Sequence, residues 1–345
     1  MDLLLAGDLG GTKTLLALYR PGTPRPERVA EQSFVSGAWP GLTPMLQRFL
    51  DDHRPAGGRC RAACLAVAGP VADDHARITN LGWELRADEL AAVADGCPLE
   101  LINDFAVLIY ALPLLAADQR SPLQEGTADP AGTLAILGAG TGLGMARGIR
   151  RQGSLQALAS EGGHRCFAPE TEAEWELSQW LRRELGLDRL SLERIVSGTG
   201  LGHIACWRLS DVDGHPLQAQ ARAWRGAPAA VDGPDLPALV SAAANAGDGA
   251  ARSVVDLWLG AYGSAAGDLA VHEMATGGVW VGGGTARKQL SGLQSPPFLE
   301  RMRRKGRFSD LVAGLPVTAL TDPGAGLFGA ACRSQLLAEC GEGAA

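Results

Sequence analysis

Two glycine-rich loops, each set between apolar runs, constrain the fold of this chain more than any other feature of its sequence. Residues 8–12 (DLGGT) separate the apolar runs 3–5 and 15–19, and residues 138–144 (GAGTGLG) are flanked by apolar runs in the same way. Short apolar runs bounded by turn residues predict strands, so each loop is expected to join two strands. The repeated pattern predicts two α/β halves that open alike.

Adjacent glycines allow backbone N–H groups to face a phosphate without obstruction by side chains. Neither loop has a common phosphate-binding signature: Lys13 follows Thr12 where a Walker A loop has glycine before lysine, and Leu143 stands where a Rossmann fingerprint has its third glycine. Tight turns alone would also explain either loop, whereas their joint occurrence favours phosphate binding. Asp8 is a candidate to hold Mg²⁺ through water.

A third glycine loop, residues 282–285 (GGGT), follows the apolar run 279–281. Its glycines would let a nucleotide base or ribose lie against the backbone, but a structural turn explains the same sequence. Both interpretations stay open from the residues alone.

Asn103 and Asp104 end the predicted strand 99–102 and precede the apolar segment 105–115, which we expect to be a buried helix. Asn and Asp are favoured helix caps, so capping is one interpretation. Catalysis is the other, because active groups are placed at strand ends that face a cleft. In phosphoryl transfer a carboxylate accepts the proton of the attacking hydroxyl.

Three further polar side chains are candidates to bind hydroxyl groups. Glu161 and His164 flank two glycines (EGGH), a pattern that fits hydrogen bonds to neighbouring hydroxyls of a sugar, although a single His is more often structural. Glu193 stands near the start of a predicted helix over 192–209, where a surface carboxylate is the default. We also predict a short strand at 78–80 and an irregular surface segment over 210–234.

Charge and cysteine content limit the classes of partner and compartment. A net charge of −7 and a pI near 5.4 argue against nucleic acid or an anionic membrane as the main partner. The seven cysteines are scattered and predict free thiols in a reducing compartment. No apolar run approaches the length of a membrane span, so a cytoplasmic protein is expected.

Taken together in this order, the segments resemble the bacterial glucokinase family, within the superfamily of sugar kinases, Hsp70 and actin. GDLGGTK, GAGTGLG and GGVWVGGG look like its two phosphate loops and its adenosine loop. LINDF is similar to the catalytic segment, and ASEGGH and ERIVSGTGL are similar to sugar-binding segments. The resemblance covers nearly the whole chain. Lys13 departs from it, because many members carry Asn there.

The resemblance implies ATP-dependent phosphorylation of glucose to glucose 6-phosphate, feeding glycolysis, with Asp104 as the base that takes the proton from the sugar 6-hydroxyl. ATP with Mg²⁺ would be the phosphoryl donor, and a homodimer is expected. The implied sugar-binding residues are Asn103, Asp104, Glu161, His164 and Glu193. The implied nucleotide-binding residues are Asp8, Gly10, Gly11, Thr12, Gly140, Thr141, Gly283 and Gly284, with Asp8 also near Mg²⁺.

The fold implied is α/β, a two-lobed actin-like ATPase (ribonuclease H-like) structure with a ligand cleft between the lobes. The expected domains are residues 1–113 with 323–345, and residues 114–322.

Rival functions stay open: a kinase of another hexose (fructose, mannose or an amino sugar), a donor such as ADP or polyphosphate, and a non-catalytic sugar sensor on the same fold. The first glycine loop begins within ten residues of Met1, which leaves no room before it for the DNA-binding segment of a repressor. An actin-like filament or chaperone ATPase predicts no sugar-binding residues.

Overall fold

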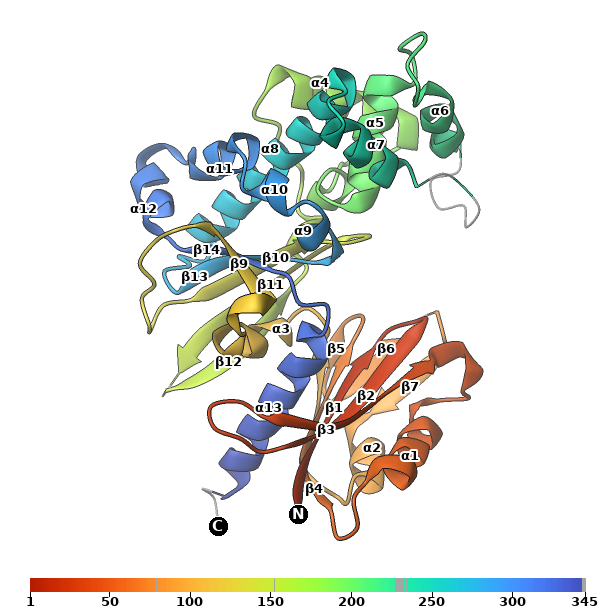
Figure 1. The fold of residues 1–345 in the computed structure, drawn as a ribbon, viewed down its shortest axis with the longest axis vertical. Coiled ribbons are helices and arrows are strands. Elements are labelled where there is room, and N and C mark those ends of the chain that lie inside the picture. Colours follow the sequence, from red (N-terminus) through yellow and green to blue (C-terminus); the bar gives the residue numbers. More distant parts are fainter. Residues whose placement is uncertain (79, 152, 227–232, 234, 343–345) are drawn as a thin grey trace. The chain divides into compact units, whose positions relative to one another are not determined.

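The computed structural model describes residues 1–78, 80–151, 153–226, 233 and 235–342 (Figure 1). The chain forms two compact units. The first comprises Met1–Gln119, Arg151–Ala159 and Asp322–Ala345, and the second comprises Arg120–Arg150 and Ser160–Thr321. Each unit has its own mixed sheet and hydrophobic core, so both are α/β structures.

The first unit is built on a five-stranded sheet with the order β3-β2-β1-β4-β8. Strand β1 pairs antiparallel with β2 and parallel with β4, which in turn is parallel to β8. The strands are β1 (Asp2–Leu9), β2 (Lys13–Arg20), β3 (Glu27–Val35), β4 (Arg59–Val67) and β8 (Leu99–Asn103). A separate three-stranded sheet contains β5 (Val71–Ala72), β6 (His75–Ile78) and β7 (Trp83–Arg86).

Helices pack on both faces of the five-stranded sheet. The helices are α1 (Leu42–His53), α2 (Ala87–Val93), α3 (Leu108–Ala111) and α13 (Ala325–Glu342). Leu3 and Leu5 of β1 share one core cluster with Met45 and Phe49 of α1. Helix α13 packs against β1 and β4, where the Ser334 hydroxyl donates to the Leu5 carbonyl at 2.8 Å. Figure 1 shows α13 on the opposite face of this sheet from α1 and α2.

The second unit contains the strands β11-β10-β13-β14-β9 in that spatial order. They are β9 (Arg120–Gln124), β10 (Leu134–Ala139), β11 (Leu143–Arg151), β13 (Gly278–Gly282) and β14 (Val317–Leu320), and β12 (Ser154–Ser160) follows β11 in the chain. Strands β10 and β11 form an antiparallel hairpin around the second glycine loop, and β13 runs parallel to β10.

The long helix α8 is the centre of the second unit's helical layer, because α5, α7 and α11 all pack on it. Its Trp258 and Tyr262 are fully buried. The helices are α4 (Glu172–Leu185), α5 (Gly198–Leu209), α6 (Gln218–Gly226), α7 (Leu236–Asn245), α8 (Gly249–His272), α9 (Gly284–Lys288), α10 (Leu290–Leu293), α11 (Pro296–Arg303) and α12 (Ser309–Gly314). None of the described helices is long and apolar enough to cross a membrane.

The structure corrects three of the local predictions. Residues 105–115 hold only the four-residue α3 followed by a 3₁₀ turn, Leu112–Leu114, instead of one long helix. Residues 192–209 are a 3₁₀ turn, Leu192–Arg194, followed by α5; the break falls at Ser197, whose extended backbone and hydroxyl cap α5 through the Gly200 N–H at 2.9 Å.

The segment 210–234 is also more regular than expected, because it contains α6. Residues 227–232 and 234 lie outside the described residues, as does Thr79 of the predicted strand at 78–80, where β6 ends at Ile78.

Candidate active site

The first glycine loop is a tight turn between β1 and β2. The Gly10 N–H donates to the Lys13 carbonyl at 3.0 Å, which closes the turn. Ser36 ties the loop down from outside: its hydroxyl donates to the Gly10 carbonyl at 2.8 Å and its N–H donates to the Thr12 carbonyl at 3.0 Å. The loop is therefore held in one shape, while the Thr12 side chain stays exposed.

Close packing limits the residues that this loop tolerates. A Cβ added at Gly11 would lie 1.9 Å from Nδ2 of Asn80, so only glycine fits there without a shift of the Asn80 side chain.

Asp8 is half-buried, and a Cβ added at Gly326 of α13 would lie 2.9 Å from Oδ2 of Asp8. Burial raises the pKa of the Asp8 carboxyl, and the nearby Lys13 charge partly offsets that rise.

Sheet register places Asn103 and Asp104 at the same edge as the first glycine loop. Leu9 at the end of β1 pairs with Val67 at the end of β4, and Val67 pairs with Asn103 at the end of β8. The Asp104 N–H donates to the Val67 carbonyl at 2.9 Å. Because the carboxyl ends of parallel strands meet at one edge, the first loop and Asp104 share that edge.

The Asn103 side chain holds the turn that carries Asp104. Its Oδ1 accepts from the N–H groups of Phe105 and Ala106, each at 3.0 Å. Its Nδ2 donates to the Gly69 carbonyl and to Oδ1 of Asp104, each at 3.1 Å. Asn103 therefore holds a turn and does not cap a helix, because the N-cap position of α3 is Val107. The hydrogen bond from Nδ2 restrains the Asp104 carboxylate.

In the second unit, the second and third glycine loops lie side by side. Gly138 of β10 pairs with Gly282 of β13, so both parallel strands end together. The Thr285 hydroxyl donates to the Ala139 carbonyl at 2.6 Å. Gly283 has a φ of +82°, and a Cβ there would lie 2.6 Å from the same carbonyl oxygen. The third loop therefore requires glycine at 283.

A pocket of about 680 Å³ opens beside these two loops. That volume lies in the range of small-molecule sites, roughly 300–1,000 Å³. Its lining includes Gly140 and Thr141 of the second loop, Gly284 and Thr285 at the start of α9, and residues of α7 between Pro237 and Asn245. Lys288 places a positive charge in the lining. A pocket walled by two glycine loops and a helix start fits a phosphorylated nucleotide.

Glu193 contacts the strand that follows the second loop. Its Oε2 accepts from the Leu143 N–H at 3.0 Å, and a Cβ at Gly142 would lie 2.5 Å from the same oxygen. Gly163 also lies close to Leu143, because a Cβ added at Gly163 would lie 2.2 Å from the Leu143 carbonyl oxygen. The 3₁₀ turn Gly162–His164 and the turn that carries Glu193 therefore converge on Leu143.

Glu161 and His164 face solvent on the first of these turns. The carboxylate Oε2 of Glu161 lies 3.7 Å from Nε2 of His164, and the side chains are 74% and 58% exposed. The Arg189 guanidinium donates to the His164 carbonyl at 2.7 Å and so holds the backbone of the turn. Two exposed polar groups on a restrained turn can bind adjacent hydroxyls of a ligand.

The predicted residues thus form one group in each unit. In the first unit, the group at the sheet edge is Asp8, Gly10, Gly11, Thr12, Asn103 and Asp104. In the second unit, the group around the two loops and Leu143 is Gly140, Thr141, Glu161, His164, Glu193, Gly283 and Gly284.

The sequence analysis named the segment ERIVSGTGL but not the residues within it that contact the second glycine loop. The Gly198 N–H donates to the Gly140 carbonyl at 2.8 Å, and the Thr199 hydroxyl donates to the Thr141 carbonyl at 3.2 Å. Ser197-Gly198-Thr199-Gly200 has the composition of a loop that contacts phosphate, which is the signal that could have identified it. Helix α7, which walls the pocket, carries no comparable signal.

Comparisons with known proteins agree on one family. The glucokinase family model matches residues 5–336. A glucokinase of Synechocystis sp. is 39% identical over 96% of this chain and 98% of its own length. The solved glucokinase of an Antarctic psychrotroph is 31% identical, with a TM-score of 0.81 over 97% of this chain and 99% of that one.

The fold extends to more distant sugar kinases. A ROK family glucokinase from Streptomyces griseus, solved in complex with glucose and AMPPNP, has a TM-score of 0.58 at 20% identity, over 97% of this chain and 99% of that one. These neighbours share the actin-like ATPase fold, which confirms the fold class predicted from the sequence. This chain belongs to the glucokinase family.

Proposed function

We propose that this chain transfers the γ-phosphoryl group of ATP to the 6-hydroxyl of glucose, with Asp104 as the catalytic base. The observation that carries the proposal is the restraint of Asp104 by Asn103, whose Nδ2 donates to its Oδ1 at 3.1 Å. A carboxylate held at the end of a parallel strand is placed to accept a proton. As a glucokinase, the chain is an enzyme that forms glucose 6-phosphate and so feeds glycolysis.

The reaction is an in-line displacement at phosphorus. The 6-oxygen of glucose forms a bond to the γ-phosphorus while the bond from that phosphorus to the bridging oxygen of ADP breaks, and ADP leaves. Asp104 accepts the proton of the 6-hydroxyl. No phosphorylated enzyme is formed, because the phosphoryl group passes directly between the two substrates.

Glu161, His164 and Glu193 orient the sugar through its other hydroxyls, while Asn103, whose amide is fully hydrogen-bonded within the protein, acts on the sugar through Asp104. The exposed carboxylate and imidazole on the turn Gly162–His164 support this assignment for Glu161 and His164. Glu193 has one oxygen bound to the Leu143 N–H, which fixes its carboxylate beside the second loop. Fixing the orientation of the reacting hydroxyl contributes much of the rate enhancement of such enzymes.

ATP binds to the glycine loops. The pocket beside Gly140, Thr141 and Gly284 has the volume for its adenosine, and its glycines let phosphates approach the backbone closely. Gly283 packs closely against the Ala139 backbone and so holds the third glycine loop beside the second. Gly10, Gly11 and Thr12 form the first phosphate loop, where the exposed Thr12 hydroxyl is available as a donor.

Mg²⁺ fits the donor set around Asp8. A half-buried carboxylate beside a phosphate loop suits a cation that keeps most of its water ligands. The described residues contain no cluster of three or more His, Cys, Asp or Glu side chains that could hold a metal by themselves. Bound Mg²⁺ would neutralise charge on the ATP phosphates, and Asp8 would hold it through water.

We also propose that the enzyme is a cytoplasmic homodimer, as its family resemblance implies. The predicted domain limits, residues 1–113 with 323–345 and residues 114–322, stay a prediction that limited proteolysis with mass spectrometry of the fragments would test.

The product of the reaction tests the proposed function. The purified chain is incubated with glucose, ATP and Mg²⁺, and the sugar product is identified by ³¹P and ¹³C NMR. We expect phosphate on carbon 6 and stoichiometric ADP. A phosphate on another carbon, or ADP formed without a phosphorylated sugar, would contradict it.

A further inference from the structure

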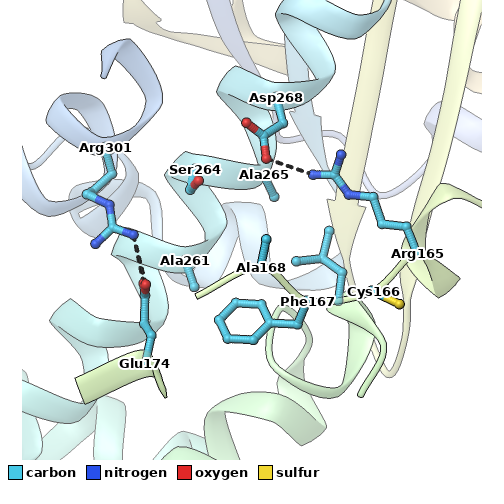
Figure 2. Close-up of a pocket in the computed structure, with 11 residues that line it drawn as sticks. Arg165, Cys166, Phe167, Ala168, Glu174, Ala261, Ser264, Ala265, Asp268 and Arg301 are labelled. Carbon is cyan, nitrogen blue, oxygen red and sulfur yellow. Dashed lines mark hydrogen bonds and ion pairs between the residues drawn. The ribbon is translucent and has the colours of Figure 1, made fainter. Parts of the chain in front are cut away.

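The residues that follow His164 line a small pocket of about 110 Å³ in the second unit (Figure 2). Arg165, Asp268 and Ser264 line it, together with Glu174 and Arg301. Figure 2 shows the Arg165 guanidinium pointing to the Asp268 carboxylate, and the Arg301 guanidinium pointing to Glu174. The pocket is therefore bordered by two ion pairs. Glu170 links them, because its carboxylate lies 3.4 Å from Nε of Arg301 and 3.6 Å from Nζ of Lys305.

Glycines in α8 bring the basic end of α11 close to this pocket. A Cβ at Gly263 would lie 2.1 Å from the Phe298 carbonyl oxygen. A Cβ at Gly267 would lie 2.1 Å from the Met302 carbonyl oxygen and 2.5 Å from Cε of Lys305. The two helices touch at their backbones, so the Lys305 side chain lies along α8.

Lys305 is a buried member of a chain of charges, and its Nζ also lies 3.6 Å from Oε1 of Glu170. Its side chain is only 9% exposed, and its Nζ lies 2.7 Å from Oδ1 of Asp268. The same Nζ donates to the Ser264 hydroxyl at 3.1 Å. The other oxygen of Asp268 accepts from the Arg165 guanidinium at 3.1 Å. Asp268 therefore bridges a buried cation to the residue next to His164.

Arg165 in turn holds the backbone on both sides of the sugar-binding group. Its N–H donates to the Gly162 carbonyl at 3.2 Å, which closes the turn that carries His164. Its carbonyl accepts from the Leu192 N–H at 2.8 Å, next to Glu193. A displacement of Arg165 would move both sugar-binding turns together.

We infer that Asp268, itself fixed by Lys305, is a positioning residue for glucose binding that acts through Arg165 on the turn Gly162–His164. The inference rests on the proposed role of His164 in binding the sugar. Asp268 does not touch the reacting atoms in this account. Its effect should therefore appear in the KM for glucose, while kcat and the KM for ATP stay close to the wild-type values.

The test uses Asp268→Asn, which keeps the shape of the side chain and removes its charge. We expect the KM for glucose to rise roughly threefold to tenfold, as for a partly exposed ion pair, with kcat and the KM for ATP within about twofold of wild type. Arg147→Gln is the matched control, because Arg147 is partly exposed and pairs with Glu273 at 2.7 Å, outside the network of Lys305, Asp268 and Arg165. The control should leave all three constants unchanged.

A double-mutant cycle shows whether Asp268 acts through Arg165. Arg165→Gln should raise the KM for glucose to the same extent as Asp268→Asn, and the double variant should be no worse than either single variant. Additive increases in KM would overturn the inference. Arg165 is partly exposed, so Arg165→Gln carries the test if Asp268→Asn fails to fold.

His164→Asn separates this inference from the proposed function. If the wild type phosphorylates glucose and His164→Asn raises the KM for glucose, the sugar-binding role of the turn Gly162–His164 is supported. In that case an unchanged KM for glucose in Asp268→Asn overturns only the positioning role of Asp268. If His164→Asn leaves the KM for glucose unchanged, the sugar-binding role of the turn and the positioning role both fail.

Discussion

The Glu193 carboxylate accepts a hydrogen bond from the Leu143 backbone N–H at 3.0 Å, which joins the turn that carries Glu193 to the strand that follows the second glycine loop. The two residues are 50 positions apart in the chain. Leu143 is buried, so its N–H has little access to water if this acceptor is removed. Glu193 therefore has a structural role as well as its proposed role in sugar binding.

Glu193→Ala should lower the free energy of unfolding by about 1–3 kcal/mol, because it leaves a buried N–H without an acceptor. Glu193→Gln keeps a side-chain oxygen that can accept from the Leu143 N–H, so the free energy of unfolding should fall by less. Both variants should raise the KM for glucose. Urea unfolding and steady-state kinetics measure the two effects. Glu176→Ala, at an exposed position of α4, is the control; an Ala variant at 193 as stable as that control would refute the structural role.

Gly283→Ala should destabilise the second unit, whereas Gly284→Ala should not. Gly283 has a φ of +82°, and a Cβ added there would lie 2.6 Å from the Ala139 carbonyl oxygen. A Cβ added at Gly284 would have no heavy atom within 4 Å. We expect a loss of about 1–3 kcal/mol for the first variant and a change within about 1 kcal/mol for the second. Thermal unfolding of both variants measures the difference, and equal melting temperatures would contradict it.

Much of the fold could be predicted because its strands carry strong local signals. The apolar runs around both glycine loops are the hairpins β1–β2 and β10–β11, and the run 279–281 lies in β13. The prediction of one long helix over the apolar segment 105–115 was wrong. Its composition suits a helix, but Asn103 binds the N–H groups of Phe105 and Ala106 in a turn, and a side-chain contact of this kind leaves no periodic pattern.

The site could be predicted only in part for a similar reason. Glycine loops are visible in the sequence because few residues replace glycine there. The acceptor role of Glu193 toward Leu143 depends on two segments that meet only after folding. The wall that α7 adds to the pocket beside the second and third glycine loops likewise arises from helix packing, and the Ala-rich sequence of α7 has no mark of ligand binding.

The stability of the protein at acid pH should depend on Glu170. Burial alone would raise the pKa of this carboxyl, but hydrogen bonds from Ser264 and Arg304 and the charges of Lys305 and Arg301 lower the pKa to about 2, from an ordinary value of 4.5. A lowered folded-state pKa stabilises the folded protein above pH 4.5, and this contribution is lost as the pH falls from 4.5 towards 2.

Glu170→Gln should therefore flatten the fall in the free energy of unfolding between pH 4.5 and pH 3, relative to wild type. Ser264→Ala removes one of the hydrogen bonds to Glu170 and should give an intermediate slope. Denaturant unfolding at several pH values measures the slopes. A Gln variant with the wild-type slope would show that Glu170 does not contribute.

Asp should replace Asn103 with little loss of stability but with a large loss of activity. Asn103→Ala removes the acceptor for two backbone N–H groups and should cost about 0.5–2 kcal/mol. Asn103→Asp keeps the acceptor but loses the Nδ2 donor to Asp104 and adds a negative charge beside it. The Asp variant should therefore be more stable than the Ala variant, yet have a much reduced kcat. Full activity in Asn103→Asp would contradict the positioning of Asp104 by this amide.

The most direct test of the central claim is sugar-dependent ADP release from ATP and Mg²⁺, measured for the wild type and for Asp104→Asn with glucose, fructose, mannose and N-acetylglucosamine. Turnover with glucose, reduced by about 10²–10⁴ in kcat in the variant, is the predicted result. No turnover with any of the sugars, or an Asp104→Asn variant within tenfold of the wild type, would contradict the account.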